Sequence, residues 1–195
     1  MEKIKTSQTN PLPLKPAINA AIQLWSEQGK WHKISVVGNS MLPLMRDGNH
    51  VLVAHDSTSI HIGDVIVFWQ SDHLFVHRVI RIERTSQPVR FLTKGDNAPN
   101  FDSPVSVEEV IGRVIAIQRD DREILLDTKA WRASGYLIAW TTLLLSMFLA
   151  IGQRLKQRCV GPQPSRSTAW MRQTLAKIPS RILQFWFALF CRWKR

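Results

Sequence analysis

Hydrophobic residues between positions 33 and 126 recur in short runs that alternate with polar residues and with clusters of Gly, Asp and Asn. Short runs rich in Val and Ile and bounded by turn residues are typical of β-strands. Arg-Asp-Gly-Asn at 46–49 and Lys-Gly-Asp-Asn at 94–97 supply such turn chemistry. The pattern predicts strands over residues 34–37, 51–54, 65–69, 74–82, 89–93, 110–118 and 123–126. We therefore expect a mainly β, barrel-like domain over residues 33–130.

The N-terminal segment, residues 1–32, has a different pattern. Residues 1–16 are rich in proline and read as a lead-in. Over residues 17–28 the apolar side chains of Ile18, Ile22 and Trp25 follow helical spacing, which predicts a short amphipathic helix. No apolar run of spanning length and no signal peptide is expected in this part of the chain.

Residues 133–153 form a long apolar segment without a charged residue, between Arg132 and Arg154. As a helix rising about 1.5 Å per residue, it would cover roughly 30 Å, the thickness of a bilayer core. The alternative is a buried helix of a soluble protein, but a domain of this size could hardly enclose a helix that is apolar on every face. We expect a single transmembrane helix.

A basic, tryptophan-rich tail follows at 154–195. A linker at 161–165 precedes an expected helix from about residue 168, whose apolar stretch at 182–191 is too short to span a bilayer. Such a helix suits the surface of an anionic membrane; packing against the β domain is the alternative. Cys159 and Cys191 show no metal-ligand spacing, and we expect free thiols.

The net charge of +11 belongs to this tail rather than to the β region. Ten of the 26 Lys and Arg residues lie at 154–195, where there is no acidic residue, so the rest of the chain carries 16 basic and 15 acidic residues. A near-neutral body argues against a nucleic-acid partner. The excess of Arg and Lys after the apolar segment predicts a cytoplasmic tail and an extracytoplasmic β domain, although long segments weaken the charge rule, and the orientation stays open.

Ser40, His77 and an aspartate follow one another through the β region. A serine hydroxyl is a weak nucleophile, so it needs a base to accept its proton and a carboxylate to orient that base. Asp96 and Asp102 are the two candidates for the carboxylate. His73 hints at a metal site with His77, but Asp72 would point to the opposite strand face and supplies no third ligand.

Four sequence blocks surround these residues. They are Ser-Met-Leu-Pro at 40–43, Gly-Asp before a hydrophobic run at 63–68, His-Arg-Val at 77–79, and Lys-Gly-Asp-Asn at 94–97 with an aspartate at 102. In this order they resemble the signal peptidase I family, in its Ser–His branch of endoplasmic-reticulum and archaeal type. The Ser–Lys branch and the self-cleaving LexA-like repressors carry lysine at the position of His77.

The resemblance implies a role for each residue. Ser40 would be the nucleophile, His77 the general base and Asp102 the orienting acid, with Asp96 in a supporting role. Family members commonly carry a serine, which can donate to the oxyanion, where this chain has Gly38. The backbone N–H of Ser40 remains as a donor, and we expect Asn39 or a backbone amide to replace the missing hydroxyl.

The resemblance thus predicts a membrane-anchored serine endopeptidase that cleaves signal or leader peptides from precursor proteins. The substrate would dock as an added β-strand, with small residues at the first and third positions before the cut. No metal or organic cofactor is implied, and the need for partner subunits stays open. The alternatives are a LexA-like self-cleaving regulator, which would need a lysine base and a DNA-binding N-terminus, and a non-catalytic membrane module.

Overall fold

The computed structural model describes residues 20, 24–25, 31–55, 59–84, 88–120 and 122–160. Of the helix expected over residues 17–28, Ala20, Leu24 and Trp25 are described, and all three are helical. The linker and the basic helix expected beyond residue 160 lie outside the described residues.

The described residues form one antiparallel sheet, which continues into a long helix. In sheet order the main path runs β1-β2-β7-β3-β4-β5-β6, with β8 paired to β7. The strands are β1 (His32–Ser35), β2 (His50–Ala54), β3 (Val65–Gln70), β4 (His73–Glu83), β5 (Arg90–Lys94), β6 (Val105–Ser106), β7 (Val110–Arg119) and β8 (Arg122–Leu125). A short 3₁₀ helix, η1 (Val107–Glu109), precedes β7. The predicted mainly β fold is confirmed.

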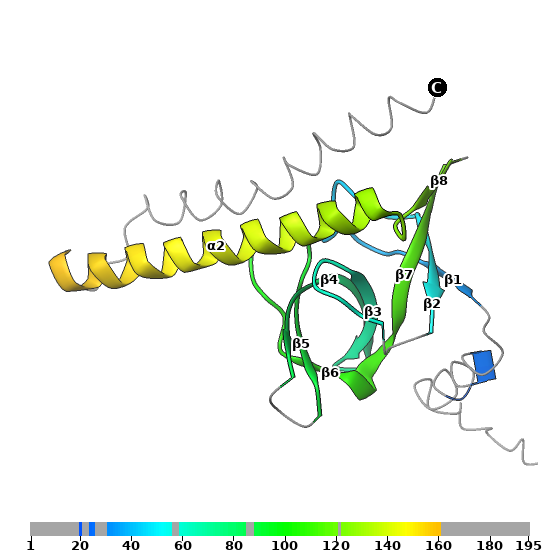
Figure 1. Cartoon of the computed structure of the whole chain (residues 1–195), viewed down its shortest axis with the longest axis horizontal. Helices are drawn as coiled ribbons and strands as arrows, with labels where there is room; N and C mark the ends of the chain where they lie inside the picture. The colour runs from blue at the N-terminus through cyan, green and yellow to red at the C-terminus, as the bar shows by residue number, and fades with distance from the viewer. Residues whose placement is uncertain are drawn as a thin grey trace, which may run out of the picture.

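The sheet is strongly curved (Figure 1). Register shifts in the pairing of β2 with β7, β3 with β7 and β4 with β5 mark irregularities of the kind that bend and twist a sheet. Strand β3 separates two hydrophobic clusters: Val65, Val67 and Trp69 pack into one, and Ile66 and Phe68 into the other. Because both faces of β3 are buried, its sequence is a continuous apolar run rather than an alternating one.

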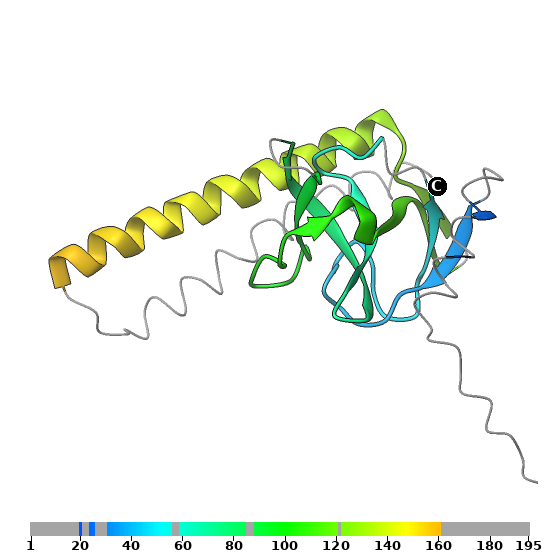
Figure 2. The same cartoon turned by 90° about the horizontal axis from the view of Figure 1, so that it is seen from below.

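Helix α2 (Lys129–Val160) begins next to the sheet and then projects beyond it (Figures 1 and 2). Its residues from Lys129 to Gly152 are long and apolar enough to cross a membrane. One face of its first half packs on the β domain and includes the polar residues Ser134 and Thr142, so the helix is not apolar on every face. The buried residues of that face are Ser134, Gly135, Ile138, Ala139 and Thr142.

Candidate active site

Ser40 lies in the turn between β1 and β2, and its side chain is exposed. The turn is secured on both sides. Gly38, with a φ of 91°, donates its N–H to Asp47 Oδ1 at 2.9 Å. On the other side Met41 and Met45 are buried in the core, and the Met45 N–H donates to the Met41 carbonyl oxygen at 3.0 Å. The turn therefore presents the serine hydroxyl at the surface from a fixed backbone.

His77 lies in β4 with its imidazole buried between Ser40 and Asp102. Its Nε2 is 3.0 Å from Ser40 Oγ, and its Nδ1 is 2.7 Å from Asp102 Oδ2. Because a carboxylate only accepts hydrogen bonds, we assign the ring proton to Nδ1, which leaves Nε2 free to accept the serine proton. The rings of Phe68 and Phe75 lie 6.1 and 5.7 Å from the imidazole, centroid to centroid, and limit its movement.

Asp102 follows β5 and is held by Thr93 as well as by His77. The Thr93 hydroxyl donates to Asp102 Oδ2 at 2.8 Å, and the Asp102 N–H donates to the Thr93 carbonyl oxygen at 2.9 Å. Thr93 is fully buried. Sequence reasoning missed this residue, because nothing local distinguishes a strand threonine that faces an acid nine positions later.

Asp96, the other candidate acid, forms an ion pair with Arg78. Its two carboxylate oxygens accept hydrogen bonds from Arg78 Nε and Nη2 at 2.8 and 2.7 Å, and both side chains are buried. The structure therefore places Asp102 against His77 and Asp96 against the neighbouring Arg78. A bidentate buried pair of this kind fixes both partners in direction as well as distance.

Comparisons with known proteins identify the family of the chain. A model of the Peptidase S24-like family matches residues 6–115, more than half of the chain. The chain belongs to the Peptidase S24-like family. It is also 38% identical over 88 residues to "Signal peptidase I W" of Bacillus subtilis (strain 168). That match covers 43% of this chain and 46% of the relative, so the chain spans about half the length of the curated relative it matches. The predicted relationship to signal peptidase I is confirmed at the level of the family.

In this member of the Peptidase S24-like family, the loop at 95–98 forms hydrogen bonds to the backbone of the turn that carries Ser40. The Asn97 N–H donates to the Ser40 carbonyl oxygen at 2.7 Å, and Asn97 Nδ2 donates to the Asn39 carbonyl oxygen at 3.2 Å. A Cβ added at Gly95 would lie 2.8 Å from the Ser40 carbonyl oxygen and 3.0 Å from His77 Nε2. The close approach of the two loops thus requires glycine at position 95.

Gly38, the expected departure from the family pattern, and Asn39, the expected replacement donor, both lie in the exposed serine turn. The positive φ of Gly38 favours glycine at this position. Asn39 is one residue before the nucleophile candidate, and its carbonyl oxygen accepts from the Leu42 N–H at 3.3 Å. The Asn39 side chain is thus on the turn next to Ser40, while its role in oxyanion binding stays a prediction.

Lys94 is a buried cation close to the site, at the end of β5 opposite Arg78. Its Nζ donates to the Gly95 carbonyl oxygen at 3.4 Å. Burial lowers the pKa of Lys94 below its ordinary value, since desolvation outweighs the attraction of Asp96 and Asp102. Within the described residues there is no group of three or more His, Cys, Asp and Glu side chains that could hold a metal ion.

Proposed function

We propose that the chain is a serine endopeptidase in which Ser40, His77 and Asp102 act as a triad. The observation that carries this proposal is the continuous chain of contacts from the Ser40 hydroxyl through both nitrogens of His77 to Asp102, at 3.0 and 2.7 Å. These distances are within hydrogen-bond reach for a nucleophile, its base and the group that orients the base.

In the proposed reaction Ser40 Oγ attacks the carbonyl carbon of the scissile bond as His77 Nε2 accepts its proton. The imidazolium then returns that proton to the leaving amine, and a water molecule hydrolyses the acyl-enzyme by the same route. Asp102 holds the imidazole in the tautomer with the proton on Nδ1 and stabilises the positive charge that forms. The chemistry needs no metal or organic cofactor.

The proposed oxyanion donors are the Ser40 N–H and either the side-chain amide of Asn39 or a backbone amide. Loss of one such donor costs about 10²–10³ in turnover. An Asn39→Ala enzyme with unchanged kcat would exclude the side chain from this role.

By analogy with the relative named as a signal peptidase, the proposed substrate is the signal or leader segment of a precursor protein. The exposed position of Ser40 leaves room for an extended segment to approach. His77 at the usual lysine position favours the Ser–His branch over the LexA-like alternative.

Helix α2 is the proposed single membrane anchor. Its packed face ends at Thr142, so the part beyond, from 143 to 152, adds only about 15 Å of apolar helix. A bilayer core is roughly 30 Å thick. A complete crossing by the 24 residues from Lys129 to Gly152 would therefore carry the packed half of the helix, and the face of the β domain that covers it, into the hydrocarbon core. Extraction of membranes with alkaline carbonate should leave the full-length chain in the pellet; its release into the supernatant would contradict the anchor.

The decisive experiment uses the full-length chain in detergent with a precursor that carries an Ala-x-Ala signal peptide. Wild type should cleave it at one site, while Ser40→Ala and His77→Ala should lose activity by at least about 10³-fold with unchanged thermal unfolding. Equal cleavage by wild type and Ser40→Ala would refute the mechanism. Wild type incubated alone serves as a further control, since self-cleavage would favour the regulator alternative.

A further inference from the structure

Helix α2 meets the sheet at a contact between two glycine backbones. Gly63, with a φ of 92°, lies in the turn before β3, and Gly135 lies in the second turn of α2. A Cβ added at Gly63 would overlap the backbone of Gly135 and Tyr136. One added at Gly135 would lie 2.5 Å from the Gly63 carbonyl oxygen. Any side chain at either position would therefore separate the helix from the turn.

Arg78 connects this contact to the candidate active site. Its Nη1 donates to the Gly63 carbonyl oxygen at 2.8 Å, while Nε and Nη2 donate to the two oxygens of Asp96. The side chain of Arg78 is 5% exposed, so no solvent layer separates it from these partners. A planar guanidinium bonded on two edges cannot follow one partner without disturbing the other.

The path continues from Asp96 to Ser40 through the loop at 95–98. Asn97, next to Asp96 in this loop, donates its N–H to the Ser40 carbonyl oxygen at 2.7 Å. On the other side, Arg78 follows His77 directly along β4. The glycine contact is thus linked to the nucleophile candidate through Arg78 and the loop at 95–98, and to its base through the backbone of β4.

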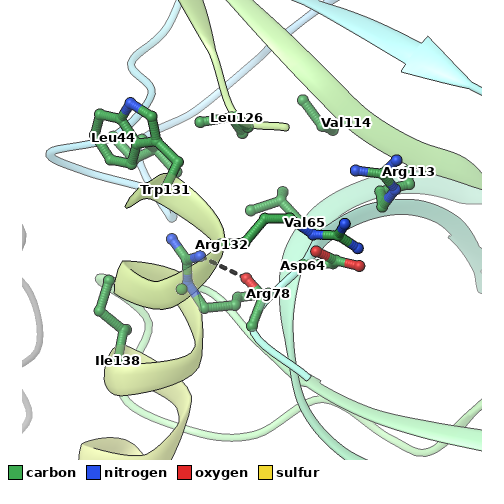
Figure 3. Close-up of a pocket in the computed structure, with 12 residues that line it drawn as sticks. Leu44, Asp64, Val65, Arg78, Arg113, Val114, Leu126, Trp131, Arg132 and Ile138 are labelled. Atoms are coloured by element: carbon green, nitrogen blue, oxygen red, sulfur yellow. Dashed lines mark hydrogen bonds between the residues drawn. The ribbon is translucent and has the colours of Figure 1, made fainter. Parts of the chain in front are cut away.

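Little free space surrounds this path. The cavity beside the glycine contact measures about 20 Å³, enough for about one water molecule, and lies between α2 and the strands (Figure 3). Among the residues that line it are Gly63, Arg78 and Gly135. Because packed interiors transmit displacements rather than absorb them, a shift of α2 at Gly135 should move Arg78 and the loop that it holds.

We propose that α2 is part of the catalytic unit as well as an anchor, and that Gly135 is a positioning residue. Its contact with Gly63 fixes Arg78, and Arg78 fixes the loop that supports Ser40. The proposal rests on the proposed peptidase function. It predicts that separating α2 from the sheet impairs catalysis even on a soluble substrate, whereas a helix that only anchors would leave such catalysis unchanged.

The test compares Gly135→Val with Gly152→Val in the full-length chain in detergent. Gly152 is a matched control, because it lies in the same helix and an added Cβ there has nothing within 4 Å. With a soluble precursor peptide, Gly135→Val should lower kcat roughly 10- to 100-fold, as expected for a misplacement of about 1 Å, and leave KM within about twofold. Gly152→Val should match wild type in both constants.

A second readout does not depend on activity. The ring ¹⁵N resonances of His77, assigned by comparison with His77→Ala, should shift in Gly135→Val and stay in place in Gly152→Val. If wild type cleaves nothing, the proposed function fails, and the His77 resonances still decide the coupling. Wild-type kcat and unshifted resonances in Gly135→Val would overturn the proposal, as would equal losses in both variants.

If Gly135→Val does not fold, Gly135→Ala and Gly152→Ala give the same comparison, because a single methyl at 135 already lies 2.5 Å from the Gly63 oxygen.

Discussion

Thr93→Val should slow the proposed hydrolysis without unfolding the protein. Valine has nearly the shape of threonine but lacks the hydroxyl that donates to Asp102 Oδ2 at 2.8 Å. The Asp102 N–H bond to the backbone of residue 93 survives the change. The variant therefore removes one of the two side-chain hydrogen bonds that the structure gives the proposed orienting acid and leaves its contact with His77 in place.

The size of the effect follows from the chemistry of this bond. A hydrogen bond to a charged group contributes about 1.5–3 kcal/mol. Because the Asp102 side chain is 14% exposed, water can replace part of the lost bond, which favours the lower end of that range. A loss of about 1.4 kcal/mol in the transition state corresponds to a roughly tenfold lower kcat. KM should change little, since Thr93 is fully buried and out of reach of a substrate.

The assay measures kcat and KM for cleavage of an Ala-x-Ala precursor peptide, with thermal unfolding recorded in the same detergent. Thr93→Ser is the matched control, because it keeps the hydroxyl and loses only a methyl group; its kcat should stay within about threefold of wild type. Wild-type kcat in Thr93→Val would refute the role of the hydroxyl. An equal loss in Thr93→Ser would show that packing, and not the hydrogen bond, matters at this position.

Three further predictions concern Lys94 at the end of β5 and the loop that follows it. Gly95→Ala should lower kcat roughly 100-fold with little change in KM, because its methyl would lie 2.8 Å from the Ser40 carbonyl oxygen; wild-type kinetics would contradict the close approach. Asp96→Ala should lower the free energy of unfolding by about 3–5 kcal/mol, since it leaves Arg78 charged and buried; denaturant titration measures this, and a change below about 1 kcal/mol would refute it. Lys94→Met should unfold at a higher temperature than wild type near pH 7. The unfolded state holds the Lys94 proton more tightly, so wild-type stability should rise as the pH approaches 10.5 and the advantage of the methionine variant should shrink; a constant advantage would contradict this.

The sequence predicted well those features that depend on local pattern. The expected strands at 51–54, 65–69 and 110–118 match β2, β3 and β7 to within one residue at each end. Strand β6 was missed, because its two residues carry no periodicity. Ser40 and His77 lie in contiguous motifs, and a contiguous motif can be recognised without knowledge of the fold.

The partners of these residues depend on contacts between distant segments. Two aspartates six positions apart look equivalent in the sequence, and only the path of the chain after β5 sends Asp102 to His77 and Asp96 to Arg78. Thr93 faces the acid because Asp102 folds back along β5 and pairs with its backbone. Such assignments are properties of tertiary packing, which periodicity within one segment does not record.

Helix α2 shows how an average over a segment can hide a difference between the faces of one helix. The mean hydropathy of 1.7 over its most apolar 18 residues averages all faces together. The small residues Ser134, Gly135 and Ala139 nevertheless gather on one face, where the backbone of the helix approaches that of the turn before β3. Large apolar side chains such as Leu137, Trp140 and Leu144 lie exposed on the rest of the surface. Apart from Ile138, the residues of the packed face are small, so residue size marks this face of the helix better than hydropathy does.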